Sequence, residues 1–398
     1  MTTLNIVRIV LTSFIAYAVM ASIMTPLGII SQPISDLFNV LITETTSKFS
    51  YITSGILAGS VAAFFIFDWF KVKTVIIVNC IVIAIAITLL YLINDYTWLP
   101  ICFVAIGISS SVNLTASAIV ITRVFSEGKR ASMLLLTDCF YSLGAMGSSY
   151  AAAYLIAQKY HWVSAYLLVL FLVIVIVVIA SLSSYTEEEA AHSLETLRPC
   201  VTEKWPLSVY FCSASIFLYL LGMVSLYSWM PNYAQSVLHI TQEKSGQLLS
   251  YYFAGMFVGQ IGLFFLVLKF PIGRLILITS GCAAIINSSL WNISNVDTLT
   301  ITLFLLGVFA GGLLKTFITY GTLAMANSPT RLVSFLMLSM GLGTAVAPAI
   351  SASIVAQTSA IGALMLSSFC YVMTFIFAVV CVYLQSRTPL IVQTVSPN

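Results

Sequence analysis

Long runs of apolar residues recur along the whole chain, separated by short segments that hold most of its charged residues. A helix needs roughly 20 mostly apolar residues to cross a bilayer. The runs are continuous, whereas the strands of a membrane barrel would alternate polar and apolar positions, so the pattern favours helices. It predicts an all-α membrane protein with twelve transmembrane helices, near residues 7–30, 46–69, 74–94, 98–122, 132–157, 162–185, 206–231, 244–268, 271–293, 298–325, 332–357 and 361–385.

The composition supports a membrane protein. Of the 398 residues, 60% are hydrophobic and only 7% are charged, whereas a soluble domain carries about 25% charged residues. The eight cysteines occur singly and the three histidines fall in predicted loops. The sequence contains no metalloprotease, serine-hydrolase or phosphate-loop motif, so we expect no enzyme activity, no cofactor and no metal site.

Lysine and arginine gather on one side of the predicted bundle, with twelve residues there against three on the other side. Cytoplasmic loops carry an excess of Lys and Arg, so we expect both termini in the cytoplasm. The net charge of +3 then reports membrane topology and not nucleic-acid binding. The first group is Arg8, Lys71, Lys73, Arg123, Lys129, Arg130, Arg198, Lys204, Lys269, Arg274, Arg331 and Arg387, and the second is Lys48, Lys159 and Lys244.

One stretch of the chain occurs twice. SYITSGILAGSVAAFF at residues 50–65 returns as SYYFAGMFVGQIGLFF at residues 250–265. Glycines four residues apart share one helix face and allow close helix packing in lipid. The repeat therefore predicts equivalent packing faces on the second and eighth helices, made by Gly55, Gly59, Gly255 and Gly259.

The repeat implies two similar halves. The two copies lie on the second and the eighth helices, and this even offset of six gives both copies the same direction, as in a parallel repeat. The only long polar connection follows the sixth helix and is rich in glutamate. We expect an N-terminal six-helix bundle at residues 1–185, a cytoplasmic linker at 186–205 and a C-terminal six-helix bundle at 206–398.

These features together resemble the major facilitator superfamily of transporters. That family has a charged loop after the second helix, and this chain places Asp68, Lys71 and Lys73 there. The resemblance implies a cytoplasmic latch formed by these three residues, with a plain helix-end carboxylate as the alternative for Asp68.

Two further stretches are similar to the TsgA-like branch of bacterial transporters in that superfamily. They are LLLTDCFYSLGAMGSSYAAAYLIAQ at residues 134–158 and SWMPNYAQ at residues 228–235. The Trp-x-Pro-x-Tyr pattern also resembles the fucose-permease group of sugar–proton symporters. This chain lacks the carboxylates that the fucose-permease group places in its first and fourth helices.

Two charged residues fall well inside predicted helices: Asp138 in the fifth and Lys315 in the tenth. An ionisable residue at such depth costs roughly 2.5–3.5 kcal/mol on insertion scales and usually faces a partner or a cavity. In the resembled fold these helices come from opposite halves and lie close together, so we expect an ion pair that opens during transport. A neighbouring ammonium favours the charged carboxylate, so opening the pair would favour proton uptake. The alternatives are a static salt bridge and an anion-binding Lys315.

The resembled fold lines its central cavity with the first, fourth, seventh and tenth helices. Polar and aromatic side chains at middle depth of these helices could bind a polar solute, although any single one could also serve packing or an interfacial belt. Tyr251 and Gln260 on the eighth helix are further candidates. The cavity candidates are Tyr17, Thr25, Asn113, Thr115, Tyr219, Tyr227, Thr316, Thr319 and Tyr320, with Trp229 near the outer mouth.

Three prolines, Pro26, Pro231 and Pro348, fall inside the first, seventh and eleventh predicted helices. A proline removes a helical hydrogen bond, so we expect a break in each of these helices.

The sequence therefore predicts a secondary active transporter that works by alternating access between two rocking bundles. We expect a small polar solute, coupling to protons, and a monomeric multi-pass protein in the lipid bilayer of a bacterial inner membrane. The alternatives are a transport-inactive sensor or scaffold on the same fold, and a facilitative or anion-exchanging carrier that uses Lys315.

Overall fold

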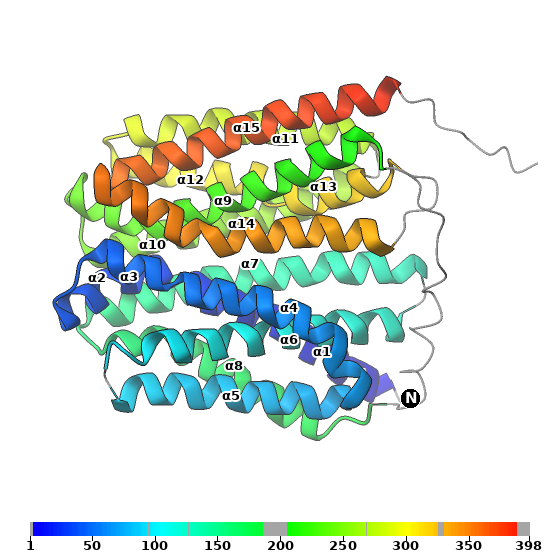
Figure 1. The fold of residues 1–398 in the computed structure, drawn as a ribbon, viewed down its shortest axis with the longest axis horizontal. Coiled ribbons are helices and arrows are strands. Elements are labelled where there is room, and N and C mark those ends of the chain that lie inside the picture. The colour runs from blue at the N-terminus through cyan, green and yellow to red at the C-terminus, as the bar shows by residue number, and fades with distance from the viewer. Residues whose placement is uncertain are drawn as a thin grey trace, which may run out of the picture.

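The chain forms a single layered bundle of long helices that run roughly parallel to one another (Figure 1). Helix α1 begins and helix α15 ends at one end of this bundle, which we call the terminal end. The short helix α3 (Ile42–Lys48) lies at the other end, which we call the opposite end. This computed structural model describes residues 3–93, 95–125, 127–185, 205–267, 269–324 and 330–387.

The first half of the chain makes six crossings of the bundle. The first crossing is divided between two helices, and the sixth begins with a 3₁₀ turn. The elements are α1 (Thr3–Met24), α2 (Leu27–Phe38), α3, α4 (Ser50–Trp69), α5 (Val72–Ile93), α6 (Leu99–Val124), α7 (Glu127–Ala157), η1 (Trp162–Tyr166) and α8 (Leu167–Ser181).

The second half repeats this arrangement with six more crossings. Here the fourth crossing is divided between two helices, and a 3₁₀ turn follows the third. The elements are α9 (Leu207–Ser236), α10 (Gln242–Val267), α11 (Ile272–Ser289), η3 (Leu290–Asn292), α12 (Val296–Ala310), α13 (Leu313–Thr322), α14 (Thr330–Gln357) and α15 (Ala360–Arg387).

The predicted twelve-helix membrane fold is confirmed. Within the described ranges, ten helical segments are long and apolar enough to cross a membrane. The remaining two crossings are α4 and α7, which run beside the others between the two ends (Figure 1). The predicted linker at 186–205 lies outside the described residues except for Trp205.

Only one of the three expected proline breaks occurs. Pro26 separates α1 from α2, but α9 runs through Pro231 and α14 runs through Pro348 without interruption. The expected breaks at Pro231 and Pro348 are therefore wrong. Prolines are tolerated in membrane helices because neighbouring groups can satisfy the freed backbone. A break that the sequence analysis did not predict occurs instead at Gly311–Gly312, between α12 and α13.

Helices α1 and α9 form the centre of the bundle. Residues 9–24 of α1 are buried almost without exception, and so are residues 219–234 of α9. By contrast, α5, α8 and α15 carry many exposed apolar side chains, such as Ile85, Ile174 and Phe369. Exposed apolar faces on outer helices are what contact with lipid requires.

The repeated glycines make equivalent backbone contacts in the two halves. A Cβ atom at Gly55 would collide with the backbone of Val104, and one at Gly255 would collide with the backbone of Phe304. Likewise, Gly59 lies against Ile108 and Gly259 against Val308. Each contact of the α4–α6 pair thus recurs in the α10–α12 pair 200 residues later.

These contacts predict how the helices tolerate added volume. Gly255→Ala should lower the free energy of unfolding by about 1–3 kcal/mol, because the new methyl group overpacks the contact with α12. Gly262→Ala on the same helix is the matched control, since a Cβ atom there meets nothing within 4 Å. Thermal unfolding of the purified protein in detergent measures both. Equal melting temperatures for the two variants would contradict the packing role.

Candidate functional site

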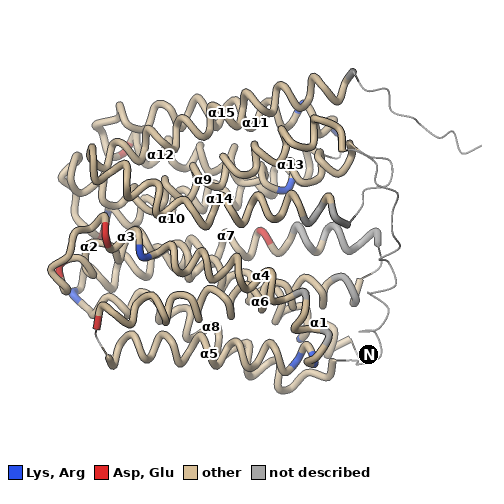
Figure 2. Tube along the Cα trace, in the orientation of Figure 1, with Lys and Arg blue, Asp and Glu red and all other residues tan. Residues whose placement is uncertain are grey.

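The two charged side chains at membrane depth face each other. The Nζ atom of Lys315 lies 3.6 Å from Oδ1 of Asp138. Asp138 belongs to α7 in the first half of the chain, and Lys315 belongs to the first turn of α13 in the second half. Figure 2 shows the other charged residues mainly at the two ends of the bundle. The ion pair therefore links the two halves in the region between these ends.

Both side chains of the pair are partly accessible. The exposed fraction is 32% for the Lys315 side chain and 20% for the Asp138 side chain. Their neighbours on the same helices, Thr137 and Thr316, are buried. The pair is therefore held within packed helices but can be reached by a small polar molecule.

Tyrosines from the two central helices surround the pair. Tyr17 of α1 interacts electrostatically with both charges, and its hydroxyl pairs with the side chain of Thr137. Tyr219 of α9 also interacts with Asp138. Both tyrosines are buried, at 8% and 2% exposure. Thr316 and Thr319, two other predicted cavity residues, lie beside Lys315 on α13, and the Thr319 hydroxyl donates to the Lys315 carbonyl.

The break at Gly311–Gly312 sits immediately before the helix that carries Lys315. A helix end leaves carbonyl groups without helical partners. The Tyr219 hydroxyl donates a hydrogen bond to the Ala310 carbonyl at the end of α12, at 2.8 Å. Tyr219 therefore supports the broken backbone and lies beside the ion pair.

The sequence analysis missed part of this aromatic cluster. Tyr141 of α7, Tyr252 of α10 and Tyr371 of α15 all lie in it, and the hydroxyls of Tyr252 and Tyr371 are 3.5 Å apart. The rings of Tyr219 and Tyr371 make an edge-on contact with centroids 5.7 Å apart. Tyr227, a predicted cavity residue, interacts with Tyr141 and Tyr252.

The helical phase decides which tyrosine of α10 enters the cluster. The sequence analysis chose Tyr251, but that side chain is 48% exposed on the outside of the bundle, whereas Tyr252 is fully buried. Gln260 does face the interior, since its Oε1 accepts a hydrogen bond of 2.9 Å from the Ser142 hydroxyl of α7. The glycine spacing does not separate the two tyrosines, because they lie four and three residues before Gly255 and both fall on its side of the helix.

The other predicted cavity residues make hydrogen bonds or packing contacts with nearby protein groups. Thr25 bonds the Ala145 carbonyl, Asn113 bonds the Cys80 thiol, and the Trp229 indole donates to the Ser351 hydroxyl. The Tyr320 ring lies close to Gly273 of α11. The hydroxyls of Thr115, Thr316 and Thr319 each bond a carbonyl one turn earlier in their own helix. A solute-binding role for these residues stays a prediction.

The predicted latch residues are only partly described. The Asp68 side chain lies outside the described part of the structure. The Lys73 ammonium donates to the carbonyls of Ser181 and Ser183 at the end of α8, at 2.9 Å each. Lys73 therefore neutralises the negative end of a helix dipole within its own half. A latch role for Asp68, Lys71 and Lys73 stays a prediction.

The two halves pack tightly toward the opposite end. A Cβ atom at Gly28 of α2 would collide with the backbone carbonyls of Tyr227 and Ser228 of α9. The Thr53 hydroxyl of α4 donates to the Ala345 carbonyl of α14 at 3.1 Å. Toward the terminal end the same helix pair carries exposed apolar side chains, including Val61 and Met337. The contacts of Gly28 and Thr53 join the two halves toward the opposite end.

Among the described residues, no three His, Cys, Asp or Glu side chains cluster in a way that could hold a metal ion.

The fold, with an ion pair at membrane depth between its two halves, is that of a membrane transporter of a known class. The profile of the Major Facilitator Superfamily matches residues 9–337, and the chain belongs to that family. Its members are transporters and not enzymes.

Similar proteins cover nearly the whole chain. The chain is 27% identical to the protein TsgA homolog of Buchnera aphidicola over 97% of its length and 98% of that protein. It is 24% identical to the protein TsgA of Shigella dysenteriae, over 94% of this chain and 95% of that one.

Solved structures share the fold. The D-xylose-proton symporter matches with a TM-score of 0.73 and 11% identity, covering 96% of each chain. FucP in the outward conformation matches with a TM-score of 0.63 and 16% identity, over 95% of this chain and 99% of that chain.

A double-mutant cycle should measure the interaction free energy between Asp138 and Lys315. Lys315→Gln alone leaves Asp138 as an unpaired charge, whereas Asp138→Asn with Lys315→Gln removes both charges. We expect the single variant to unfold at a lower temperature than the double variant, with a coupling free energy of about 1–3 kcal/mol. Thermal unfolding of the two single variants, the double variant and the original protein gives this value. Additive effects would show that the two charges are independent.

Proposed function

We propose that the protein is a secondary active transporter that moves a small polar solute across the bacterial inner membrane by alternating access, coupled to protons through Asp138. The observation that carries this proposal is the ion pair between Asp138 and Lys315, which joins the two halves of the chain at 3.6 Å. Membership in a family of transporters supports the general activity.

The position of the pair explains how a proton could be coupled to movement. In alternating access the two halves rock against each other, so a contact between α7 and α13 lengthens in one state. Removing one partner from a buried ion pair leaves an uncompensated charge, which is strongly destabilising. A proton on Asp138 removes its negative charge and lowers the cost of separation. Asp138 is then protonated in the state in which the pair is separated and charged in the state in which the pair is formed.

The packing of the two halves suggests which state the structure represents. Gly28 against α9, and Thr53 against Ala345, hold the halves together at the opposite end. The excess of Lys and Arg supports a cytoplasmic terminal end. With that orientation, the solute site is closed to the outside and faces the cytoplasm.

The side chains near the pair favour a small solute that forms hydrogen bonds. Tyr17, Tyr141 and Tyr219 offer hydroxyls and aromatic faces, which suit a polar molecule with a ring or an apolar side. Lys315 is more exposed than Asp138. This difference favours a second candidate, an exchanger that binds an anionic solute at Lys315 without proton coupling.

Asp138→Asn separates coupling from solute binding. In proteoliposomes, this variant should lose uphill accumulation driven by a pH gradient while it still exchanges solute across the membrane. The isosteric amide cannot carry the transported proton. Asp36→Asn is the matched control, because Asp36 is exposed near the end of α2 and accepts a hydrogen bond from the nearby Gln32. It should accumulate solute normally.

The outcomes distinguish the candidates. Full uphill accumulation by Asp138→Asn would refute proton coupling through this residue. Loss of both binding and exchange in Lys315→Gln, in a protein that exchanges solute but shows no accumulation driven by a pH gradient, would instead support the anion exchanger. A thermal-shift screen of metabolites supplies the solute for these assays, since a bound ligand raises the melting temperature.

Closure at the opposite end is tested at Gly28. A leucine there cannot approach the Tyr227 carbonyl, so Gly28→Leu should hold the halves apart and reduce turnover by about tenfold or more, which corresponds to about 1.4 kcal/mol. Gly262→Leu, at a glycine with open space beside it, should leave turnover unchanged. Counterflow of labelled solute measures both. Normal counterflow by Gly28→Leu would show that this contact does not form part of the transport cycle.

A further inference from the structure

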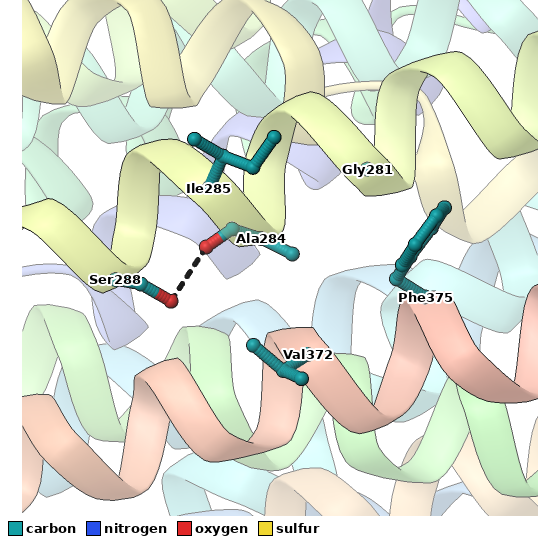
Figure 3. A pocket seen from close by; sticks show the side chains of 6 residues that line it. All are labelled: Gly281, Ala284, Ile285, Ser288, Val372 and Phe375. Carbon is teal, nitrogen blue, oxygen red and sulfur yellow. Dashed lines mark hydrogen bonds between the residues drawn. The ribbon is translucent and has the colours of Figure 1, made fainter.

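An apolar groove lies on the outside of the bundle between α11 and α15, away from the ion pair. Its volume is about 380 Å³. The groove exists because α11 presents small residues to α15, and Figure 3 shows Gly281 and Ala284 facing Val372 and Phe375 across it. A Cβ atom at Gly281 would already touch the Phe375 ring at 3.1 Å.

The groove has no polar group available for a solute. Its one hydroxyl, that of Ser288, donates to the Ala284 carbonyl of the same helix at 2.7 Å, as Figure 3 shows. Polar ligands need convergent hydrogen-bonding groups, so the groove fits a hydrocarbon chain instead.

The groove also opens toward the lipid. Ile285, which lines it, is 74% exposed, and Ile278, two turns earlier on the same face, is 57% exposed. Apolar side chains this exposed on a membrane-crossing helix contact acyl chains. The occupant therefore comes from the bilayer.

A positive charge stands at the terminal end of the same face. Arg274, Ile278, Gly281 and Ile285 follow one another at spacings of three or four residues, which places them in one row on α11. Arg274 is exposed, and exposed Lys269 in the preceding connection adds a second positive charge. At 1.5 Å per residue, Gly281 lies about 10 Å and Ser288 about 21 Å along the helix from Arg274.

The Gly281 end of the groove lies within one leaflet. Half of the hydrocarbon core is about 15 Å thick, so a lipid with its phosphate at Arg274 would bring the distal part of one acyl chain into the groove. Basic sites between membrane helices bind anionic lipid headgroups.

We propose that α11 and α15 form a binding site for an anionic diacyl phospholipid, with one acyl chain in the groove at Gly281 and the phosphate at Arg274. This site is independent of the transport site. An occupied groove fills the gap between α11 and α15 and stiffens the second half of the chain.

Native mass spectrometry tests the site with dioleoyl phosphatidylglycerol as the anionic probe and dioleoyl phosphatidylcholine as the zwitterionic one. The original protein should retain phosphatidylglycerol in preference to phosphatidylcholine. Arg274→Gln should lower retention of phosphatidylglycerol about fivefold, the loss expected for one surface cation. Lys244→Gln, which removes an exposed cation at the opposite end, is the matched control.

The groove itself is tested by filling it. Gly281→Leu and Val372→Phe, from the two sides, should each reduce retention of both lipids, whereas Gly262→Leu on the outer face of α10 should not. Val372 is partly exposed, so its replacement gives a second result if Gly281→Leu fails to fold, as judged by thermal unfolding. Equal retention by the groove variants and the control would overturn the acyl-chain site. An unchanged lipid preference in Arg274→Gln would overturn the phosphate site.

Discussion

A carboxylate and an ammonium at membrane depth are each unfavourable alone, and the arrangement around Asp138 and Lys315 follows from that constraint. The pair is contributed by opposite halves of the chain, so neither half can bury its charge without the other. Any movement of one half against the other changes the electrostatic energy of both. Under the proposed mechanism, this link makes the relative position of the two halves sensitive to protons and to charged solutes.

The broken fourth crossing of the second half adjusts this pair. Because α12 ends at Ala310 and α13 begins at Leu313, the helix that carries Lys315 is short and can tilt separately from α12. Tyr219 holds the freed Ala310 carbonyl from the central helix α9. Tyr219 therefore links the central helix α9 to the backbone that precedes Lys315.

The sequence predicted features that depend on transfer from water to lipid or on close backbone approach. The apolar runs located the crossings, and the paired glycines marked faces that do pack. Features that depend on the direction of a side chain around its helix could not be predicted from the sequence. One residue of helical rotation separates lipid-facing Tyr251 from buried Tyr252, and Pro231 and Pro348 carry no local sign that their helices continue. The groove at Gly281 arises from two helices far apart in the chain, so no local pattern reveals it.

The constant offset between the glycine contacts bears on the history of the chain. The glycine contacts at Val104 and Ile108 recur at Phe304 and Val308. The offset between the two halves is the same for each glycine and for its contact residue. Descent of the halves from one ancestral unit then implies that neither copy has a net insertion or deletion relative to the other across this region. An inserted residue would rotate everything beyond it by about 100° around the helix and turn a bulky side chain toward the neighbouring backbone. The packing of these helices therefore tolerates substitution more readily than a change in length.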